Sequence, residues 1–322
     1  MEREDRVLMA KEAIEAHKKE YYHEGCYEKA DFWDFAEIFE IIDDAYENFG
    51  GDEYIKMFRE MYGFAIKTFG ETWENNPYND DIMWLCIALT RAYMFTGEKK
   101  YLDSAKKNFD LTWERAYSED LGGGLFWRVE NQSKNVCVNC PGSIAASLIA
   151  GATGDEEYYK KADLALGWVA KYMFEPDCGK VYDAMDISGR VHRWSSTYNQ
   201  GTFIGANMLL YKHTGDTKYL DRASASAKYV KEVMYQNGVM NNEESGNDLP
   251  GFKGILARWL YRFAISTGKT EYIDWLRLNA ASAYSNRNGK GIMQTQLASK
   301  TEDKYYDVFT ASAAVSVIVN SI

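Results

Sequence analysis

The chain has 322 residues, of which 46% are hydrophobic and 15% aromatic, so it can bury the core of one large domain. Its formal net charge of -11 argues against nucleic acid and anionic membrane surfaces as partners. The aromatic surplus suits a neutral, hydroxyl-rich ligand.

With only 4 prolines in the chain, the sequence favours helix throughout. We find no uninterrupted run of 18 apolar residues and therefore expect no segment that crosses a membrane. The charged N-terminus does not resemble a secretory signal. We accordingly expect a cytoplasmic protein, or a secreted one if the chain is the mature form of a longer precursor.

The 5 cysteines are odd in number and scattered along the chain, which predicts reduced thiols. Two of them form the motif Cys137-Val-Asn-Cys140. A structural zinc site needs four ligands, and the sequence has no second Cys-x-x-Cys and no paired histidines. We interpret both cysteines as structural thiols, with redox or metal chemistry as the alternative, and expect neither a metal nor a cofactor.

The pattern Thr-Gly-x-x-x-Tyr recurs in the chain. Helix-period apolar residues lead up to each Thr-Gly, and glycine accepts the left-handed turn that ends a helix. Polar residues then start a second helix, which the tyrosine anchors back onto the first. Each copy therefore predicts a helix hairpin with a tight connection. The glycines of the four clearest copies are 57, 61 and 53 residues apart, a period typical of stacked helix pairs: Gly97, Gly154, Gly215 and Gly268.

Extending the pattern from these turns predicts twelve helices. In chain order they cover residues 2–22, 33–48, 52–68, 80–96, 99–117, 139–153, 155–174, 199–215, 217–236, 251–267, 270–284 and 306–320. Every second helix, starting with the second, is richer in small and apolar residues and is predicted to form an inner ring. We predict an all-α fold, an (α/α)6 toroid of six helix hairpins in a single domain over residues 1–322. An open solenoid of helix pairs is the alternative.

Loop lengths indicate which end of this fold carries function. The connections from inner to outer helices are tight, whereas those from outer to inner helices are long. Long loops in a compact domain usually carry function, and all six of these lead to the N-termini of the inner helices. The six long connections cover residues 23–32, 69–79, 118–138, 175–198, 237–250 and 285–305.

Adjacent carboxylates, Asp80 and Asp81, stand on this rim at the start of a predicted inner helix. Paired carboxylates are the working groups of most glycosidases, where one acts as acid and the other as nucleophile or base. Helix capping is the simpler interpretation, because Asn79 is a good N-cap and acidic residues favour the first turn of a helix. The other polar and aromatic residues on the same rim favour a catalytic role.

These further rim residues are candidates for substrate binding. Aromatic faces can stack on a sugar ring, while amide, carboxylate and ammonium groups can bond its hydroxyls. Core packing is the alternative for the two tryptophans, helix capping for Asn139 and Asn199, and an ordinary surface position for Lys253. The candidates are Trp33, Trp127, Lys134, Asn135, Asn139, Asp183, Tyr198, Asn199, Gln200, Phe252 and Lys253.

Four segments resemble glycoside hydrolase family 76, the endo-α-1,6-mannanase family. They are Tyr78-Asn-Asp-Asp-Ile-Met-Trp84, Lys134-Asn-Val-Cys-Val-Asn-Cys-Pro141, Thr197-Tyr-Asn-Gln-Gly-Thr-Phe203 and Gly251-Phe-Lys-Gly-Ile255. The resemblance runs from about Trp33 to the C-terminus. The second segment departs from the family, which usually has Ile-Ser-Asn before the proline.

The resemblance implies an (α/α)6 barrel, α-1,6-mannan or its oligosaccharides as substrate, and net retention of anomeric configuration. Carried onto this chain, Asp80 would be the nucleophile and Asp81 the acid/base. Retention needs the two carboxyl groups about 5–5.5 Å apart. We expect the negative charge of Asp80 to raise the pKa of Asp81 so that it can protonate the leaving oxygen.

Other functions remain open on the same architecture. A sugar 2-epimerase would need paired histidines at inner-helix ends, which His192 and His213 do not supply well. An unsaturated uronyl hydrolase would need basic residues for a carboxylate substrate, and few lie near the rim. A non-catalytic carbohydrate-binding protein is the third alternative. We expect the chain to act as a monomer.

Overall fold

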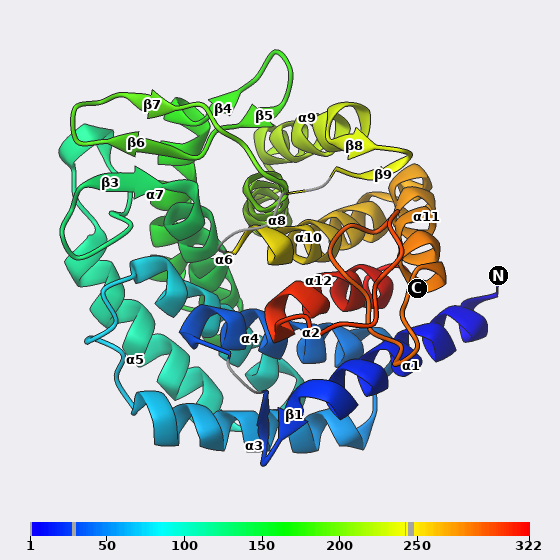
Figure 1. The fold of residues 1–322 in the computed structure, drawn as a ribbon. Coiled ribbons are helices and arrows are strands. Elements are labelled where there is room, and N and C mark those ends of the chain that lie inside the picture. Colours follow the sequence, from blue (N-terminus) through cyan, green and yellow to red (C-terminus); the bar gives the residue numbers. More distant parts are fainter. Residues whose placement is uncertain (1, 28–29, 242, 244–247) are drawn as a thin grey trace. The chain divides into compact units, whose positions relative to one another are not determined.

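The computed structural model describes residues 2–27, 30–241, 243 and 248–322, and helices dominate it (Figure 1). The chain divides into two compact units. The first comprises residues 1–64 and 230–322, and the second comprises residues 65–229. The boundaries fall within α3 (Asp52–Phe69) and α9 (Thr217–Val233). The single-domain organisation expected from the sequence stays a prediction.

All twelve predicted helices are confirmed within the described ranges, and each lies within three residues of its predicted bounds. The first unit contains α1 (Arg3–Tyr21), α2 (Phe32–Phe49), α10 (Phe252–Thr267), α11 (Thr270–Ser285) and α12 (Val308–Val319). The second contains α4 (Asn79–Thr96), α5 (Lys99–Ala116), α6 (Val136–Thr153), α7 (Glu156–Tyr172) and α8 (Thr197–Thr214). Short 3-10 helices cover Asp120–Gly122 and Leu249–Gly251.

The predicted glycine turns close the hairpins as expected. The φ angles of Gly97, Gly154, Gly215 and Gly268 are 68°, 75°, 70° and 70°, in the left-handed region that favours glycine. In Gly97, Gly154 and Gly215, the amide donates to the carbonyl four residues earlier. The next helix then begins two residues after each glycine.

Short strands, which the sequence did not reveal, occupy several of the long connections. In the second unit, β3 (Ser133–Asn135), β6 (Ala184–Asp186) and β7 (Val191–His192) form a three-stranded antiparallel sheet (Figure 1). Three hairpins complete the set: β1 (Tyr22–His23) with β2 (Cys26–Tyr27), β4 (Phe174–Glu175) with β5 (Lys180–Val181), and β8 (Tyr235–Gln236) with β9 (Val239–Met240).

Helix α6 forms the core of the second unit. It packs against α4, α7 and α8. By length and composition alone, α6 could cross a membrane, with a mean hydropathy of 1.4 over 18 residues. Because 78% of this window is buried inside the protein, its apolar character is accounted for by packing.

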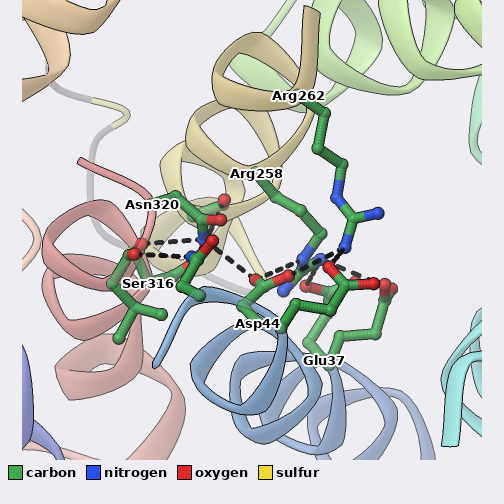
Figure 2. A network of polar contacts seen from close by, with 11 residues as sticks. Glu37, Asp44, Arg258, Arg262, Ser316 and Asn320 are labelled. Carbon is green, nitrogen blue, oxygen red and sulfur yellow. Dashed lines mark hydrogen bonds and ion pairs between the residues drawn. The ribbon is translucent and has the colours of Figure 1, made fainter. Parts of the chain in front are cut away.

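A buried network of charges ties three helices of the first unit together (Figure 2). Arg258 of α10 donates to Asp44 at 2.7 Å and to Glu37 at 3.0 Å, and it lies 3.3 Å from Glu40. Asn320, which follows α12, donates to Asp44 at 2.9 Å. The network therefore joins α2, α10 and the end of α12 through groups that water does not reach.

Burial raises the pKa of Glu37 from 4.5 to about 8. Arg258 opposes this shift, while the neighbouring Glu40 and Asp44 add to it. Several carboxylates thus share the guanidinium, and a proton on Glu37 relieves their repulsion. The folded protein therefore holds one more proton than the unfolded chain between pH 4.5 and about 8.

We expect Glu37→Gln to remove part of the pH dependence of stability. The contribution of wild-type Glu37 is fully present below pH 4.5 and is lost as pH rises through about 8, by up to about 1.4 kcal/mol per pH unit. Glutamine imitates the protonated acid, so the variant should gain stability relative to wild type over this range. Denaturant unfolding at pH 5, 6, 7 and 8 measures the difference, and a constant difference would contradict the assignment.

Candidate active site

Asp80 and Asp81 lie in the first turn of α4, within the second unit. Asn79 does not cap this helix, which corrects the simpler interpretation of the sequence. Its side chain is buried, donates to the Phe126 carbonyl at 2.9 Å and accepts from Arg115 Nε at 2.6 Å. Its amide donates to the Trp127 carbonyl at 2.8 Å. Asn79 thus fixes the loop at residues 126–127 against the start of the helix.

This loop places aromatic rings beside the paired aspartates. The rings of Tyr78 and Trp127 lie 5.6 Å apart, and the Arg128 guanidinium lies 4.6 Å from the centre of the Tyr78 ring. A β-bridge between Tyr78 and Arg128 holds the two segments together. Trp127 is half-buried, so part of its indole remains accessible to a ligand.

The small sheet brings a third carboxylate to the same place. Asn135 of β3 pairs with Ala184 of β6, and the Val136 amide, which begins α6, donates to the Asp183 carbonyl at 2.8 Å. The Asp183 carboxylate accepts a hydrogen bond from the Tyr198 hydroxyl at 2.7 Å. The first turns of α6 and α8 are therefore joined to the sheet beside Asp183.

Cys137, in the first turn of α6, contacts the catalytic candidates, whereas the sequence favoured a structural thiol, with redox or metal chemistry as the alternative. Its thiol faces the Asp80 carboxylate, and burial raises its pKa well above the usual value, with Asp80, Asp183 and Asp81 adding to the shift. The pKa of Tyr198 is likewise raised by burial and by Asp183, Cys137 and Asp80. Because these groups affect one another's pKa values, they lie in one cluster, which comprises Asp80, Asp81, Cys137, Asp183 and Tyr198.

Burial also raises the pKa of Asp80 to about 7. The Cys137 thiol, backbone amides and the Trp127 indole face its carboxylate and lower the pKa, without cancelling the effect of burial. The sequence had led us to expect the raised pKa at Asp81. Within the described residues, Asp80 Oδ1 is buried and has no hydrogen-bonding partner. Asp81 Oδ2, by contrast, accepts a hydrogen bond from the Asn76 amide at 3.0 Å.

Lys134 supports a loop, which corrects its expected role in substrate binding. The side chain is fully buried, and Nζ donates to the carbonyls of Ser118, Asp120 and Gly123, each at 2.7 Å. All three protons of the ammonium group are thereby used. Burial lowers the pKa of Lys134 to about 8.

Four polar candidates likewise hold the protein's own backbone or neighbouring side chains. Asn139 donates to the carbonyls of Leu125 and Asn135 and accepts from the Leu125 amide. Asn199 caps α8 through Ser196. The Asn135 side chain accepts from Ser133 at 2.7 Å.

Gln200 is the fourth of these candidates and is fully buried. Its amide donates to the Val181 carbonyl and to Ser195 Oγ, and it accepts from Ser226 Oγ. These hydrogen bonds within the protein support a structural role for the four side chains, and their direct contact with a ligand stays a prediction.

The remaining candidates belong to the first unit. The Trp33 ring is largely buried and lies 4.9 Å from Phe309 and 6.4 Å from Phe252, which favours core packing for Trp33. Lys253 is fully buried and donates to Thr295 Oγ1 at 3.1 Å, so it is no surface lysine. Burial lowers its pKa. Phe252 is half-buried at the start of α10.

The motif Cys137-Val-Asn-Cys140 contains two free thiols. Cys140 is fully buried, and burial raises its pKa above the usual range. Protonated, buried thiols are poor nucleophiles and poor metal ligands. Within the described ranges, no group of three or more His, Cys, Asp or Glu side chains is arranged to hold a metal ion.

The chain is similar in sequence to enzymes that cleave mannan. The sequence profile described as Glycosyl hydrolase family 76 matches residues 7–322. A mannan endo-1,6-α-mannosidase of Candida glabrata is 24% identical over 281 residues, which cover 81% of this chain and 59% of the relative. The corresponding enzyme of Saccharomyces cerevisiae is 23% identical with the same coverage. The chain thus spans about 59% of the length of these curated relatives.

Solved structures show the same likeness. An α-1,6-mannanase from Salegentibacter sp. HEL1_6 has a TM-score of 0.91 and 27% identity, and the match covers 98% of both chains. A second structure of that enzyme, with a TM-score of 0.92, is an inactive variant bound to α-1,6-mannotriose, in which two consecutive aspartates are replaced by asparagine. This likeness confirms the predicted fold class, an all-α (α/α)6 toroid.

We expect Lys134→Met to destabilise the second unit. The change leaves the buried Gly123 carbonyl and two part-buried carbonyls, of Ser118 and Asp120, without their donor. An unsatisfied buried group costs about 1–3 kcal/mol, so a loss of about that size is expected. Lys107→Met is the control, because Lys107 is exposed and its ion pair with Glu71 is 4.0 Å long. Denaturant unfolding compares the two variants, and equal stabilities would refute the assigned role of Lys134.

Proposed function

Since the chain belongs to glycosyl hydrolase family 76, we propose that it is a retaining glycoside hydrolase that cleaves α-1,6-linked mannan or mannooligosaccharides. The observation that carries the proposal is the pair Asp80-Asp81 at the start of α4, beside Trp127, Cys137 and Asp183. The structurally similar mannanase loses activity when two consecutive aspartates become asparagine. We propose that Asp80 and Asp81 correspond to that pair.

In the proposed mechanism, ionised Asp80 attacks the anomeric carbon while Asp81 transfers its proton to the glycosidic oxygen. The carbon–oxygen bond to the leaving sugar breaks, and a covalent glycosyl ester on Asp80 forms. Asp81, now ionised, removes a proton from water, whose oxygen displaces Asp80 from the anomeric carbon. Two displacements at one carbon restore its original configuration.

Side chains of the same cluster would bind the sugar. Tyr78 and Trp127 offer aromatic faces, and the Tyr198–Asp183 pair offers a hydroxyl and a carboxylate that can bond sugar hydroxyls. In the first unit, Phe252 stays a proposed apolar platform, because its ring is half-buried.

Cys137 acts in this proposal as a positioning residue. Its thiol faces the Asp80 carboxylate and lowers the pKa of Asp80 against the effect of burial. A weak donor on one side of the carboxylate orients it and favours the ionised form without the full charge of a lysine or arginine. The sequence places this thiol within the segment that departs from the family pattern.

The epimerase alternative receives no support from the positions of the histidines. His213 lies at the last turn of α8, and Tyr198 of the candidate cluster lies in the first turn of the same helix. His192 is paired with Asp186 at 3.4 Å on the small sheet. Monomeric state, a cytoplasmic location and action without a cofactor stay predictions.

We expect Asp80→Asn and Asp81→Asn each to reduce the rate of α-1,6-mannooligosaccharide cleavage by a factor on the order of 10³. The free energy of unfolding should fall little, since asparagine keeps the shape of the side chain. Proton NMR of the first product should show the α-anomer, as retention requires. Either variant cleaving near the wild-type rate would reject the assignment, and binding without turnover by the wild type would favour a non-catalytic carbohydrate-binding protein.

We expect kcat/KM to rise as pH increases through about 7, because Asp80 must be ionised to attack and its pKa is about 7. Cys137→Ala removes a group that lowers this pKa, so the rising limb should move up by about 0.5–1 pH unit. Cys137→Ser keeps a hydroxyl donor and should restore most of the wild-type profile. If kcat/KM instead falls as pH rises through 7, the result would indicate that Asp80 acts as the acid.

A further inference from the structure

A hollow lies within the second unit, at the opposite ends of the helices that begin in the candidate active site. Its volume is about 330 Å³, near the lower end of the range for small-molecule sites. It is lined by Met94 of α4, Ser147 and Gly151 of α6, Tyr159 of α7 and Lys212 of α8, together with Leu148, Leu209 and His213.

The hollow is remote from the aspartate pair. On α4, Met94 lies 14 residues after Asp80, and on α6, Gly151 lies 14 residues after Cys137. At 1.5 Å per residue, each separation is about 21 Å along a helix. A ligand in the hollow therefore cannot contact the reacting carboxylates.

One wall of the hollow is a rigid pair of rings. Tyr159 and His213 stack with their centres 3.5 Å apart and their planes within 9° of parallel. His213 Nε2 lies 3.1 Å from a carboxylate oxygen of Glu156. Both rings line the hollow and supply aromatic surface, on which the apolar face of a sugar ring can pack.

A buried hydroxyl on the floor of the hollow lacks a partner in the protein. Ser147 is 3% exposed, and its Oγ makes no hydrogen bond within the described residues. Buried hydroxyls are normally satisfied, because leaving one unpaired costs about 1–3 kcal/mol. Met94, which is 56% exposed, and Leu148 add apolar surface next to this hydroxyl.

The chemistry of the lining favours a neutral, hydroxylated ligand. Ser147, Tyr159 and Lys212 supply hydrogen-bond donors beside apolar side chains. The helices α4, α6 and α8 all end here, and the negative ends of their dipoles disfavour an anion. The lining contains no carboxylate that would hold a cation.

We propose that this hollow is a second carbohydrate-binding site, which holds a mannosyl unit of the substrate away from the point of cleavage. The choice of mannose rests on the proposed function, whereas the sugar class rests on the lining itself. A polymer held at both places would be retained between successive cleavages, because the second contact raises its effective concentration at the first.

Gly151→Phe tests this proposal by filling the hollow. Gly151 is exposed, and a Cβ added there meets only the Tyr159 hydroxyl, at an ordinary contact distance of 3.6 Å. Gly167→Phe is the matched control, because Gly167 is an exposed helical glycine of α7 in the same unit with nothing within 4 Å of an added Cβ. Tyr159→Leu, which removes the stacking wall, serves as a second test variant.

Each change is combined with Asp80→Asn, so that bound sugar is not cleaved, and calorimetry with α-1,6-mannotriose gives the number of sites. We expect two sites per chain for Asp80→Asn alone and with Gly167→Phe, and one site with Gly151→Phe or Tyr159→Leu. In the otherwise wild-type chain, Gly151→Phe should raise KM for polymeric mannan several-fold and leave mannotriose cleavage unchanged.

Equal stoichiometry for Gly151→Phe and Gly167→Phe would overturn the second site and leave the proposed hydrolase intact. Loss of one mannotriose site in a chain whose wild type does not cleave mannan would support the hollow and reject the hydrolase. The two proposals therefore fail on different measurements.

Discussion

The tight glycine turn is the constraint on which the arrangement of the site depends. Gly97, Gly154 and Gly215 each reverse the chain within two residues after an inner helix, so those connections have no length to spare. All additional length must then lie where outer helices lead to inner ones. Asp80, Cys137 and Tyr198 begin α4, α6 and α8 directly after such long connections, and this common position brings them together.

Long connections can be ordered only if their backbone groups find partners. In the second unit, buried side chains supply them: Lys134 bonds three carbonyls of one loop, and Asn79 and Asn139 bond backbone groups of residues 125–127. These residues occupy the same segments as the reactive groups. They therefore contribute to function by fixing the loops that carry Trp127 and by placing the start of α6 next to Asp183.

The sequence predicted the fold closely, because helix periodicity and glycine turns are local signals. The sequence also pointed to Asp80 and Asp81 as catalytic candidates, because two adjacent carboxylates can be recognised without knowledge of the fold. The sequence could not separate ligand-binding from structural polar residues. Lys134 and Gln200 are residue types that often bind sugar hydroxyls, yet their hydrogen bonds go to backbone groups that only the tertiary structure brings close. Cys137 was missed for the same reason, since its effect comes from facing Asp80 across two helices.

Two carboxylates whose pKa values burial raises, Glu37 and Asp80, differ in the groups that face them, and this difference bears on the nucleophilic role proposed for Asp80. Glu37 lies beside Arg258, yet burial, helped by the neighbouring Glu40 and Asp44, raises its pKa to about 8, so the group is a protonated part of a structural network. At Asp80, only neutral groups lower the pKa against the effect of burial. They are a thiol, an indole and backbone amides, and the pKa stays at about 7. A guanidinium beside Asp80 would hold it ionised and occupy the oxygens that must attack. Neutral donors can orient the carboxylate, and a pKa of about 7 lets Asp80 lose its proton near neutral pH, as the proposed attack requires.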